Sequence, residues 1–375
     1  MTSIFKDQSA ESRVGTRALL IGTDLRLLSG GIAAVLPAYQ SCLQSVHSSV
    51  RFVATHRAGS LYGKLSTFLF AVLTVLYEAC VHRKRLVVYA HAGEWPSLVR
   101  KCVLLLVAGL AGAKTILHCH APQWEVYREV SAWKRACLRW GLRRADVVTA
   151  LTNYHARQIA AVYGEKVVVV PNPLTEELLE FALVSRVQHE CSTTDVKMKV
   201  ITLCRLAEGK GAEYVPSVAR HVGGNVEFVI GGTGPLGEVL AAQVQNDSSL
   251  RNIQFAGWLT GPEKWRRLAT SDVFFLPTRA DALCTGFVEA MCLGLPVVTI
   301  DHGGNAEVVE DGVTGYVVRA DSSDLSQRLG AAVTSLACSS KRQRFGVAAR
   351  EYALRRYHPD VVKGTLRSIA KRLES

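Results

Sequence analysis

The stretch SDVFFLPTRADALCTGFVEAMCLGLPVVTIDHGGNAEVVEDGVTGYVV, residues 271–318, alternates strand-like and helix-length segments. Apolar runs of strand length occupy residues 272–276, 296–300 and 314–318. The helix-length segment after the first run ends at Gly294, which a Leu-Pro pair follows, and such residues are typical of a helix stop. Continuous Val, Ile and Leu runs favour strands buried on both faces, as in parallel sheets covered by helices. This stretch therefore predicts consecutive α/β units.

The same alternation extends over the rest of the chain. Further strands are expected at residues 17–23, 85–90, 114–119, 146–151, 166–170, 197–203, 225–231 and 252–256. A polar, strand-poor segment at Val187–Val196 interrupts the rhythm about midway, and 375 residues exceed the usual size of one domain. We therefore expect two Rossmann-like α/β domains over residues 1–185 and 198–358, each a doubly wound parallel sheet.

The formal net charge of +12 is concentrated in the first half. Residues 1–185 contain 21 Lys and Arg against 12 Asp and Glu, whereas the remainder contains 23 against 20. A basic half favours an anionic partner, which could be nucleic acid, a phosphorylated acceptor or an acidic membrane surface. Nucleic acid is the weakest of these, because the sequence has no recognised nucleic-acid-binding motif.

The ten cysteines are scattered and form no CxxC pair, so neither a zinc site nor a disulfide framework is expected. The first residues are polar and lack the apolar core of a signal peptide. The longest uncharged stretches of the first half are 13 residues between Lys64 and Glu78 and 12 between Lys101 and Lys114. Both are too short to span a bilayer, so we expect two buried helices and a cytoplasmic protein.

Candidate ligand-binding residues directly follow the expected strands. In an open parallel sheet, ligands bind beyond the carboxyl ends of the strands. The polar residues and glycines at these positions are Gly30, Gly31, His91, His120, Asn153, Asn172, Arg205, Gly232 and Asp281. Two sheets that present such edges to each other would enclose one cleft.

Two cations and two carboxylates give the clearest chemical signal. Arg205 and Lys210 lie five residues apart in LCRLAEGKG, where they could clamp a diphosphate; the alternative is a pair of solvated surface cations. Asp281 and Glu289 lie eight residues apart across a loop-to-helix turn. Carboxylates accept hydrogen bonds from sugar or ribose hydroxyls, and the helix N-terminus between them offers N–H groups to phosphate. The pattern predicts a site for a sugar and a phosphate.

Two further motifs leave alternatives open. GGTGPLG, residues 231–237, matches GxGxxG after a strand, but the next strand lacks the acidic residue that would hold a ribose. A tight turn beside phosphate, or a plain turn, is favoured over an NAD site. HCH at His118–His120 could bind a metal, yet no third ligand is evident nearby, so we expect either a structural role or a ligand contact of His120.

Taken together, the motifs resemble the retaining family 4 glycosyltransferases, which have the two-domain architecture called GT-B. The resemblance covers nearly the whole chain from about Thr16. It rests on SGGI (29–32), HCH (118–120), VVVVPNPL (167–174), LCRLAEGKG (203–211), VIGGTGP (229–235), NIQFAGWL (252–259) and LPTRADALCTGFVEAMCLGLPVV (276–298). The last segment resembles the family's E-x7-E block.

The resemblance implies a role for each cationic and glycine motif. Gly31 would bring its backbone N–H to the donor diphosphate, which Arg205 and Lys210 would neutralise beside the Gly232 turn. His120 would lie next to the transferred sugar.

The E-x7-E block would bind the rest of the donor. Glu289 would hold the ribose, while Asp281 and the backbone amides of Cys284, Thr285 and Gly286 would hold the transferred sugar and its phosphate. The sequence departs from the family here, because Asp281 replaces a glutamate and Ala-Leu-Cys replaces Gly-Phe-Gly. These departures bear on which sugar is bound.

The implied reaction moves a sugar from a nucleoside-diphosphate sugar to a glycan or lipid-linked acceptor with retention, in polysaccharide or glycolipid synthesis. No cofactor or metal is expected, since no DxD-like motif is present. The two domains would face each other across a cleft, and residues 359–375 would form a helix that returns to the first domain. The alternatives are a sugar-nucleotide epimerase or sugar phosphorylase of the same architecture, and a sugar-binding pseudoenzyme.

Charge placement adds a membrane hypothesis. The segment SAWKRACLRWGLRRAD at Ser131–Asp146 predicts a helix whose stripe of Ala132, Trp133, Ala136, Cys137 and Trp140 packs on the sheet, with its cations outward. Together with residues 83–85, these cations would hold the protein reversibly at the anionic inner face of a membrane. The alternative is a soluble acceptor.

Overall fold

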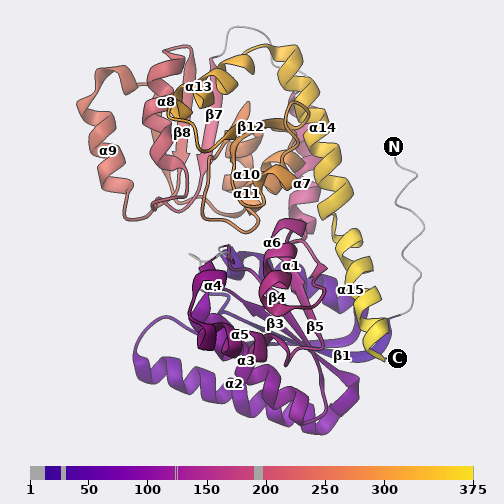
Figure 1. Cartoon of the computed structure of the whole chain (residues 1–375). Helices are drawn as coiled ribbons and strands as arrows, with labels where there is room; N and C mark the ends of the chain where they lie inside the picture. The colour runs from indigo at the N-terminus through magenta and orange to yellow at the C-terminus, as the bar shows by residue number, and fades with distance from the viewer. Residues whose placement is uncertain (1–12, 27–30, 123, 125, 190–196, 375) are drawn as a thin grey trace. The chain divides into compact units, whose positions relative to one another are not determined.

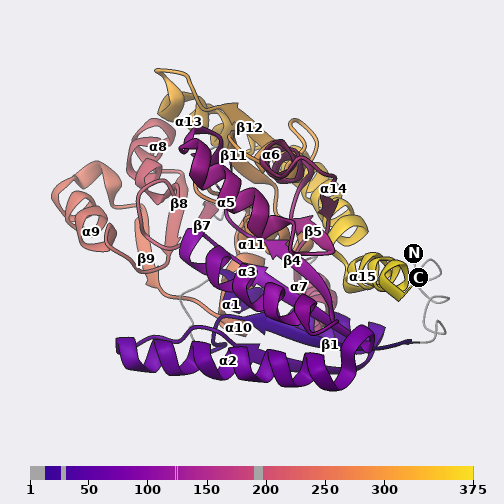
Figure 2. The ribbon, with the colours of Figure 1, turned by 60° about the horizontal axis from the view of Figure 1, so that its bottom comes forward.

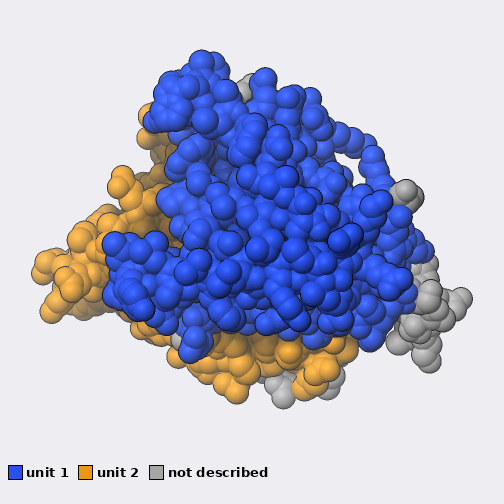
Figure 3. Space-filling model, turned by 90° about the horizontal axis from the view of Figure 1, so that it is seen from below, with its two compact units in different colours: residues 1–151, 156–173, 359–375 blue, residues 152–155, 174–358 orange. Residues whose placement is uncertain are grey.

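The structure is a computed structural model that describes residues 13–26, 31–122, 124, 126–189 and 197–374. The chain forms two compact units (Figures 1 and 3). Unit 1 comprises Met1–Leu151, Ala156–Pro173 and Pro359–Ser375, and unit 2 comprises Thr152–His155 and Leu174–His358. Each unit contains a six-stranded parallel sheet with helices packed against it, which confirms the predicted fold class.

The sheet of unit 1 has the order β2-β1-β3-β4-β5-β6, and all neighbouring strands are parallel. Its strands are β1 (Val14–Gly22), β2 (His47–Ala54), β3 (Leu86–Ala92), β4 (Lys114–Cys119), β5 (Val147–Ala150) and β6 (Val168–Val169). Strand β2 was not predicted from the sequence. This strand lies at the sheet edge and is half-exposed, so its residues HSSVRFVA mix polar and apolar side chains instead of forming a continuous apolar run.

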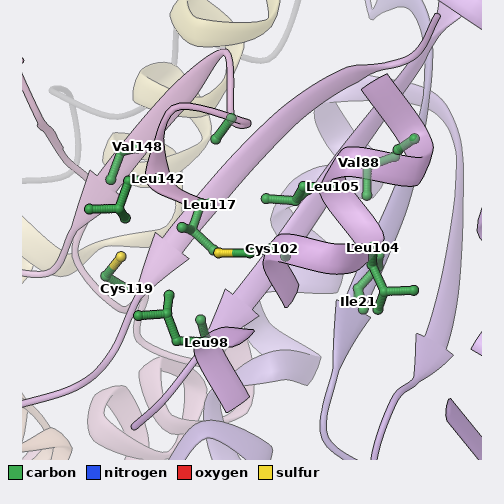
Figure 4. Packing of buried hydrophobic residues seen from close by; sticks show 14 of the residues in the cluster. Ile21, Val88, Leu98, Cys102, Leu104, Leu105, Leu117, Cys119, Leu142 and Val148 are labelled. Atoms are coloured by element: carbon green, nitrogen blue, oxygen red, sulfur yellow. The ribbon is translucent and has the colours of Figure 1, made fainter. Parts of the chain in front are cut away.

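Helices cover both faces of this sheet. One face packs against α2 (Leu61–His82), α3 (Trp95–Leu110), α5 (Ala132–Leu142) and α6 (Asn153–Tyr163). The other face packs against α1 (Gly31–Val46) and α15 (Pro359–Glu374). The short α4 (Val126–Glu129) precedes α5. In the first layer, Cys102 of α3 points toward Leu117 of β4 and behaves as a small buried apolar side chain (Figure 4).

The sheet of unit 2 has the order β12-β11-β10-β7-β8-β9 and is also parallel throughout. This is the Rossmann strand order, whereas unit 1 has the flavodoxin-like order in which the second strand lies next to the first at one edge. The strands are β7 (Met198–Leu203), β8 (Val226–Gly231), β9 (Ile253–Gly257), β10 (Val273–Phe275), β11 (Val297–Asp301) and β12 (Gly315–Arg319).

Helix α7 places the division between the units earlier than the sequence analysis did. The helices of unit 2 are α7 (Glu176–His189), α8 (Val215–Val222), α9 (Gly237–Asn246), α10 (Gly261–Ala269), α11 (Thr285–Cys292), α12 (Asn305–Val308), α13 (Leu325–Ser335) and α14 (Ser339–Tyr357). Most of α7 falls in the predicted first domain, but its Phe181 ring lies 5.9 Å from Trp265 of α10. The expected linker begins inside α7, and its residues 190–196 lie outside the described residues.

Helix α2 is not the buried helix that the sequence analysis expected between Lys64 and Glu78. It extends past both charges, and its large apolar side chains are exposed; Tyr62, for example, is 81% exposed. Among the described residues, Leu61–Arg85 is the one helical segment that is long and apolar enough to cross a membrane by length and composition alone.

The orientation of α5 also differs from the expectation. Leu138, Gly141 and Leu142 form its buried side, whereas Trp133 and Trp140 of the predicted inward stripe are exposed. The buried positions have the same helical spacing as the predicted stripe, but they lie on another side of the helix. The cations of α5 therefore share the outer surface with two tryptophans.

Candidate functional site

The strand order of unit 2 reverses direction between β7 and β10, and open α/β sheets bind ligands at such a position. The segment after β7 carries Arg205 and Lys210, and the segment after β10 carries Asp281. Because β7 and β10 are hydrogen-bonded neighbours, two loops that lie about 70 residues apart in the sequence leave the sheet side by side.

Lys210 and Asp281 form an ion pair across this position. The Nζ atom of Lys210 lies 2.7 Å from Oδ1 of Asp281 and also donates to the carbonyl of Ala280 at 2.8 Å. Both charged side chains are about one-quarter exposed, so they remain in contact with solvent. A lysine ammonium has three N–H donors, and these two contacts use two of them. The third can donate to a ligand oxygen.

Neighbouring side chains fix the two loops. Glu213 accepts hydrogen bonds from the backbone N–H groups of Gly209 and Gly211, at 2.9 and 2.8 Å, and so holds the residues on either side of Lys210. Thr278 donates its hydroxyl to Oδ2 of Asp281 at 2.7 Å. Glu213 and Thr278 were not predicted from the sequence. Their position within three residues of the predicted site residues was the available signal.

Arg205 is exposed, and among the described residues its side chain has no hydrogen-bond partner. The backbone around it is closely packed against the GGTGPLG turn. Gly232 has φ +146°, and a Cβ atom there would lie 1.8 Å from the carbonyl oxygen of Cys204. At Gly234, a Cβ atom would lie 2.4 Å from the carbonyl oxygen of Leu206. The glycines therefore allow one loop to lie directly against the segment that presents Arg205.

Helix α11 begins at Thr285, with Cys284 at its N-cap, so the amides of the predicted 284–286 segment are at a helix N-terminus. Cys284 is buried, and burial raises the pKa of its thiol, so it is neutral and is not a thiolate nucleophile. A Cβ atom on Gly286 would lie 2.9 Å from the ring of Phe274. A glycine here lets the first turn of α11 lie against β10.

Glu289 in α11 has a partner that the sequence analysis missed. Its two carboxylate oxygens lie 2.8 and 2.7 Å from Nζ of Lys264 in α10. Both side chains are about one-quarter exposed or less. Lys264 is 25 residues away, and the sequence gives no local signal for the pairing. A ligand hydroxyl that binds Glu289 would have to share this carboxylate with Lys264.

The remaining predicted residues, Gly31 and His120, belong to unit 1. Gly31 is the first residue of α1, it is exposed, and no atom of the described residues would lie within 4 Å of a Cβ there. The preceding residues of SGGI, 29 and 30, lie outside the described residues.

His120 is one of three clustered histidines. Its Nε2 lies 2.9 Å from Nδ1 of His91, and the ligand nitrogens of His91, His118 and His120 all lie within 4.8 Å of one another. The expectation that no third ligand lies near the HCH segment is therefore wrong, because His91 lies beside it. The strand register explains the cluster, because His91 of β3 is directly opposite His118 of β4.

These histidines form neutral hydrogen-bonded chains. His118 contacts the Tyr39 hydroxyl at 3.0 Å and the Thr149 hydroxyl at 2.5 Å, which engages both of its ring nitrogens. Burial lowers the pKa of His120 to about 3 and lowers the pKa values of His91 and His118 well below the ordinary range. A neutral His120 can donate or accept one hydrogen bond but carries no charge to a ligand.

The structure thus brings Arg205, Lys210, Asp281 and the Gly232 turn to one edge of the sheet in unit 2, with Cys284, Thr285 and Gly286 at the start of the following helix. Unit 1 holds Gly31 and His120 separately. Within unit 2 the arrangement offers cations and helix N–H groups to an anion, and carboxylates to hydroxyl groups.

Known families match both halves of the chain. A family model described as "Glycosyl transferases group 1" matches residues 192–352, and one described as "Glycosyl transferase 4-like domain" matches residues 21–173. The GDP-mannose-dependent alpha-(1-6)-phosphatidylinositol monomannoside mannosyltransferase of Mycolicibacterium smegmatis is 28% identical over 66% of this chain and 68% of its own. The 2-deoxystreptamine glucosyltransferase of Streptomyces kanamyceticus is 29% identical over 54% of this chain and 57% of its own.

Solved structures show the same fold. The Anabaena protein HepE, in complex with UDP and glucose, superposes with a TM-score of 0.69 at 18% identity, covering 95% of this chain and 100% of that one. The sucrose-phosphate synthase of Thermosynechococcus elongatus gives a TM-score of 0.71 at 14% identity, covering 96% and 99%.

Proposed function

The chain belongs to the group 1 glycosyl transferases, and we propose that it transfers a sugar from a nucleoside-diphosphate sugar to a glycan or lipid-linked acceptor with retention of configuration. The observation that carries this proposal is the contact between Lys210 and Asp281 across the reversal point of the second sheet. A cation suited to phosphate and a carboxylate suited to sugar hydroxyls lie side by side there, as a sugar-phosphate bond requires.

The cations supply the proposed catalysis. Cleavage of the bond between sugar and diphosphate leaves negative charge on the departing phosphate, and Arg205 and the third N–H of Lys210 stabilise that charge. Glu213 and the Gly232 turn hold the backbone around both cations before the donor binds, so little reorganisation is needed during the reaction. A leaving-phosphate oxygen takes the acceptor proton, which removes the need for a separate protein base.

The proposed classes of donor and acceptor are inferred from similar proteins. The Mycolicibacterium smegmatis relative is a GDP-mannose-dependent phosphatidylinositol monomannoside mannosyltransferase, and the structure of the neighbour HepE contains UDP. A panel of nucleotide sugars tested by thermal shift and by release of nucleoside diphosphate identifies the donor. Release that depends on an acceptor supports a transferase, conversion of the donor sugar without release indicates an epimerase, and binding without either indicates a pseudoenzyme.

The carboxylates of Asp281 and Glu289 are proposed to bind different parts of the donor. Asp281→Glu should change the preference among sugars and leave the affinity for free nucleoside diphosphate nearly unchanged. Glu289→Gln should do the reverse, because an amide replaces one of the oxygens that accept from the ribose. Competition titrations with nucleotide sugars and with the free diphosphate separate the two effects. Loss of diphosphate affinity in Asp281→Glu would contradict the assignment.

The proposed reaction uses no cofactor, because Arg205 and Lys210 provide the positive charge. Turnover should therefore persist after dialysis against a chelator. A loss of turnover that Mg²⁺ or Mn²⁺ restores would show that a metal, and not these side chains alone, neutralises the diphosphate.

A further inference from the structure

Helix α2 presents its large apolar side chains to solvent and its small ones to the protein. The exposed set is Leu61, Tyr62, Leu65, Leu69, Phe70, Leu73, Leu76, Tyr77 and Val81. The buried positions are Gly63, Ala71, Thr74, Val75, Glu78 and Ala79. A surface helix of a globular protein normally has the opposite arrangement, with its large apolar side chains facing the core.

A buried carboxylate fixes this orientation. Glu78 is the only acidic residue of α2, and its side chain is 9% exposed. It pairs with Arg51 of β2 at 2.6 Å and with His82 at 3.4 Å. Rotation of α2 to bury its leucines would break these contacts and would replace small inward residues with bulky ones against a packed sheet. The outward apolar side is therefore part of the folded structure.

The apolar surface continues onto the neighbouring helices. Helices α2, α3 and α5 lie next to one another on the same face of the sheet (Figure 2). Helix α3 exposes Trp95, Val99, Val103 and Leu110, and α5 exposes Trp133 and Trp140. We call these exposed side chains of the three helices the α2–α3–α5 surface. Monomeric soluble proteins rarely expose a continuous apolar patch of this extent.

The exposed charges within the three helices are all positive, while Glu94 and Glu129 are exposed carboxylates just before α3 and α5. Glu78 is the only carboxylate in the three helices, and it is buried. Exposed cations are Lys64 in α2, Lys134, Arg135 and Arg139 in α5, and Arg83, Lys84 and Arg85 after α2. Lys134 of α5 lies over the Trp133 ring, and Arg144, just after α5, lies over the Trp140 ring, at 5.6 and 4.8 Å from the ring centres. Paired tryptophans and cations favour the boundary between lipid headgroups and acyl chains.

These observations identify the partner by its chemistry. A second copy of this surface would bring the same cations face to face, which opposes self-association. A bilayer with anionic lipids matches both features, since the apolar side chains enter the acyl boundary and the cations meet phosphate headgroups. The inward side of α2 packs along its own sheet, so the helix can lie in the membrane surface but cannot cross the bilayer in this fold.

We propose that the α2–α3–α5 surface docks unit 1 flat on an anionic lipid bilayer. The bilayer is then a partner of the proposed transferase. The role of docking, which is to bring the enzyme to a membrane-anchored acceptor, rests on the proposed function. Docking needs neither donor nor acceptor. Vesicle binding measured without substrates, and donor turnover measured without vesicles, therefore distinguish failure of this inference from failure of the proposed function.

The test is co-sedimentation of the full chain with vesicles of phosphatidylcholine, alone or mixed with phosphatidylglycerol. The wild-type protein should pellet with the mixed vesicles, and salt should weaken this binding. The triple variant Leu69→Glu, Phe70→Glu, Leu73→Glu should lower the partition coefficient by about a hundredfold or more, because three large side chains no longer leave water. All three are well exposed, so its melting temperature should stay close to that of the wild type.

The matched control is Val239→Glu on α9, which places a glutamate at a comparably exposed valine of unit 2 and should bind vesicles like the wild type. Equal recovery in the supernatant with both vesicle types at low salt would overturn the inference, as would undiminished binding of the triple variant. A third outcome is that the wild-type protein does not bind vesicles but forms a dimer, and that the triple variant is a monomer. This outcome would assign the surface to a second copy of the chain.

Discussion

The loops at the end of the second sheet and the helix layer on the first sheet differ in how their structure is encoded. The loops place Arg205, Lys210 and Asp281 by short contacts within two segments, such as the bonds from Gly209 and Gly211 to Glu213. The helix layer is oriented by long-range contacts, such as that of Glu78 with Arg51. Local sequence therefore predicts the loops well, whereas the exposed side of a helix depends on packing that the sequence does not show directly.

The substitution with the largest expected effect on the loops of the second sheet is Gly232→Ala. The added Cβ would lie 1.8 Å from the carbonyl oxygen of Cys204, at φ +146° where a side chain is strained. We expect the free energy of unfolding to fall by about 4 kcal/mol or more, which exceeds the cost of most substitutions. Urea denaturation measures this. Gly224→Ala is the control, because none of the described atoms lies within 4 Å of its Cβ position. Wild-type-like stability of Gly232→Ala would contradict the close packing of Gly232 against Cys204.

On the first sheet, His47 should make stability depend on pH. Its ring bonds the hydroxyls of Thr16 and Tyr89 at 2.9 and 2.8 Å, and burial lowers its pKa from 6.5 to about 4. The unfolded state then binds more protons between these two values, so stability is full above pH 6.5 and falls as the pH decreases toward 4. The loss approaches about 3 kcal/mol, since each pKa unit corresponds to about 1.4 kcal/mol.

Urea denaturation at a series of pH values tests this contribution of His47. The variant His47→Gln should be less stable at neutral pH and should have a shallower slope between pH 6.5 and 4 than the wild type. The other buried histidines of unit 1 remain in the variant and contribute the residual slope. Identical slopes in the two proteins would show that His47 does not titrate as described.

The smallest expected effect concerns the helix layer. Glu78→Gln removes the charge that pairs with Arg51 and His82, and we expect a loss of about 1–2 kcal/mol, limited because Arg51 is about half exposed. Glu238→Gln on the exposed side of α9 is the matched control and should change stability little. Unchanged stability of Glu78→Gln would mean that small inward side chains alone orient α2.

The sequence predicted the parts of the molecule with a local signal. Buried parallel strands form continuous Val and Ile runs, so eleven of the twelve strands in the described part of the chain were located, and the half-exposed edge strand β2 was missed. The resemblance to group 1 glycosyl transferases is confirmed by the family matches. In the site, the loop residues Lys210 and Asp281 were expected near one ligand, and the structure places them in contact.

Features that depend on distant partners were not predicted. Lys264 pairs with Glu289 from another helix, and His91 joins the HCH segment through the register of two strands. The stripe on α5 was assigned to the sheet because its spacing is helical, but Leu138 and Leu142 have a helical spacing too. Where both sides of a helix carry apolar residues, periodicity leaves its rotation open, and only the packing against the sheet decides it.

The central claim is that Arg205 and Lys210 stabilise the departing diphosphate. The most direct measurement is the turnover of Arg205→Gln and of Lys210→Gln with the donor that the nucleotide-sugar panel identifies, followed by release of nucleoside diphosphate. Arg251→Gln serves as the control, because it removes an exposed cation of the same unit away from the site. The account predicts that kcat falls by about a hundredfold or more in each site variant, with unchanged melting temperature for Arg205→Gln. Wild-type turnover in either folded variant would contradict it.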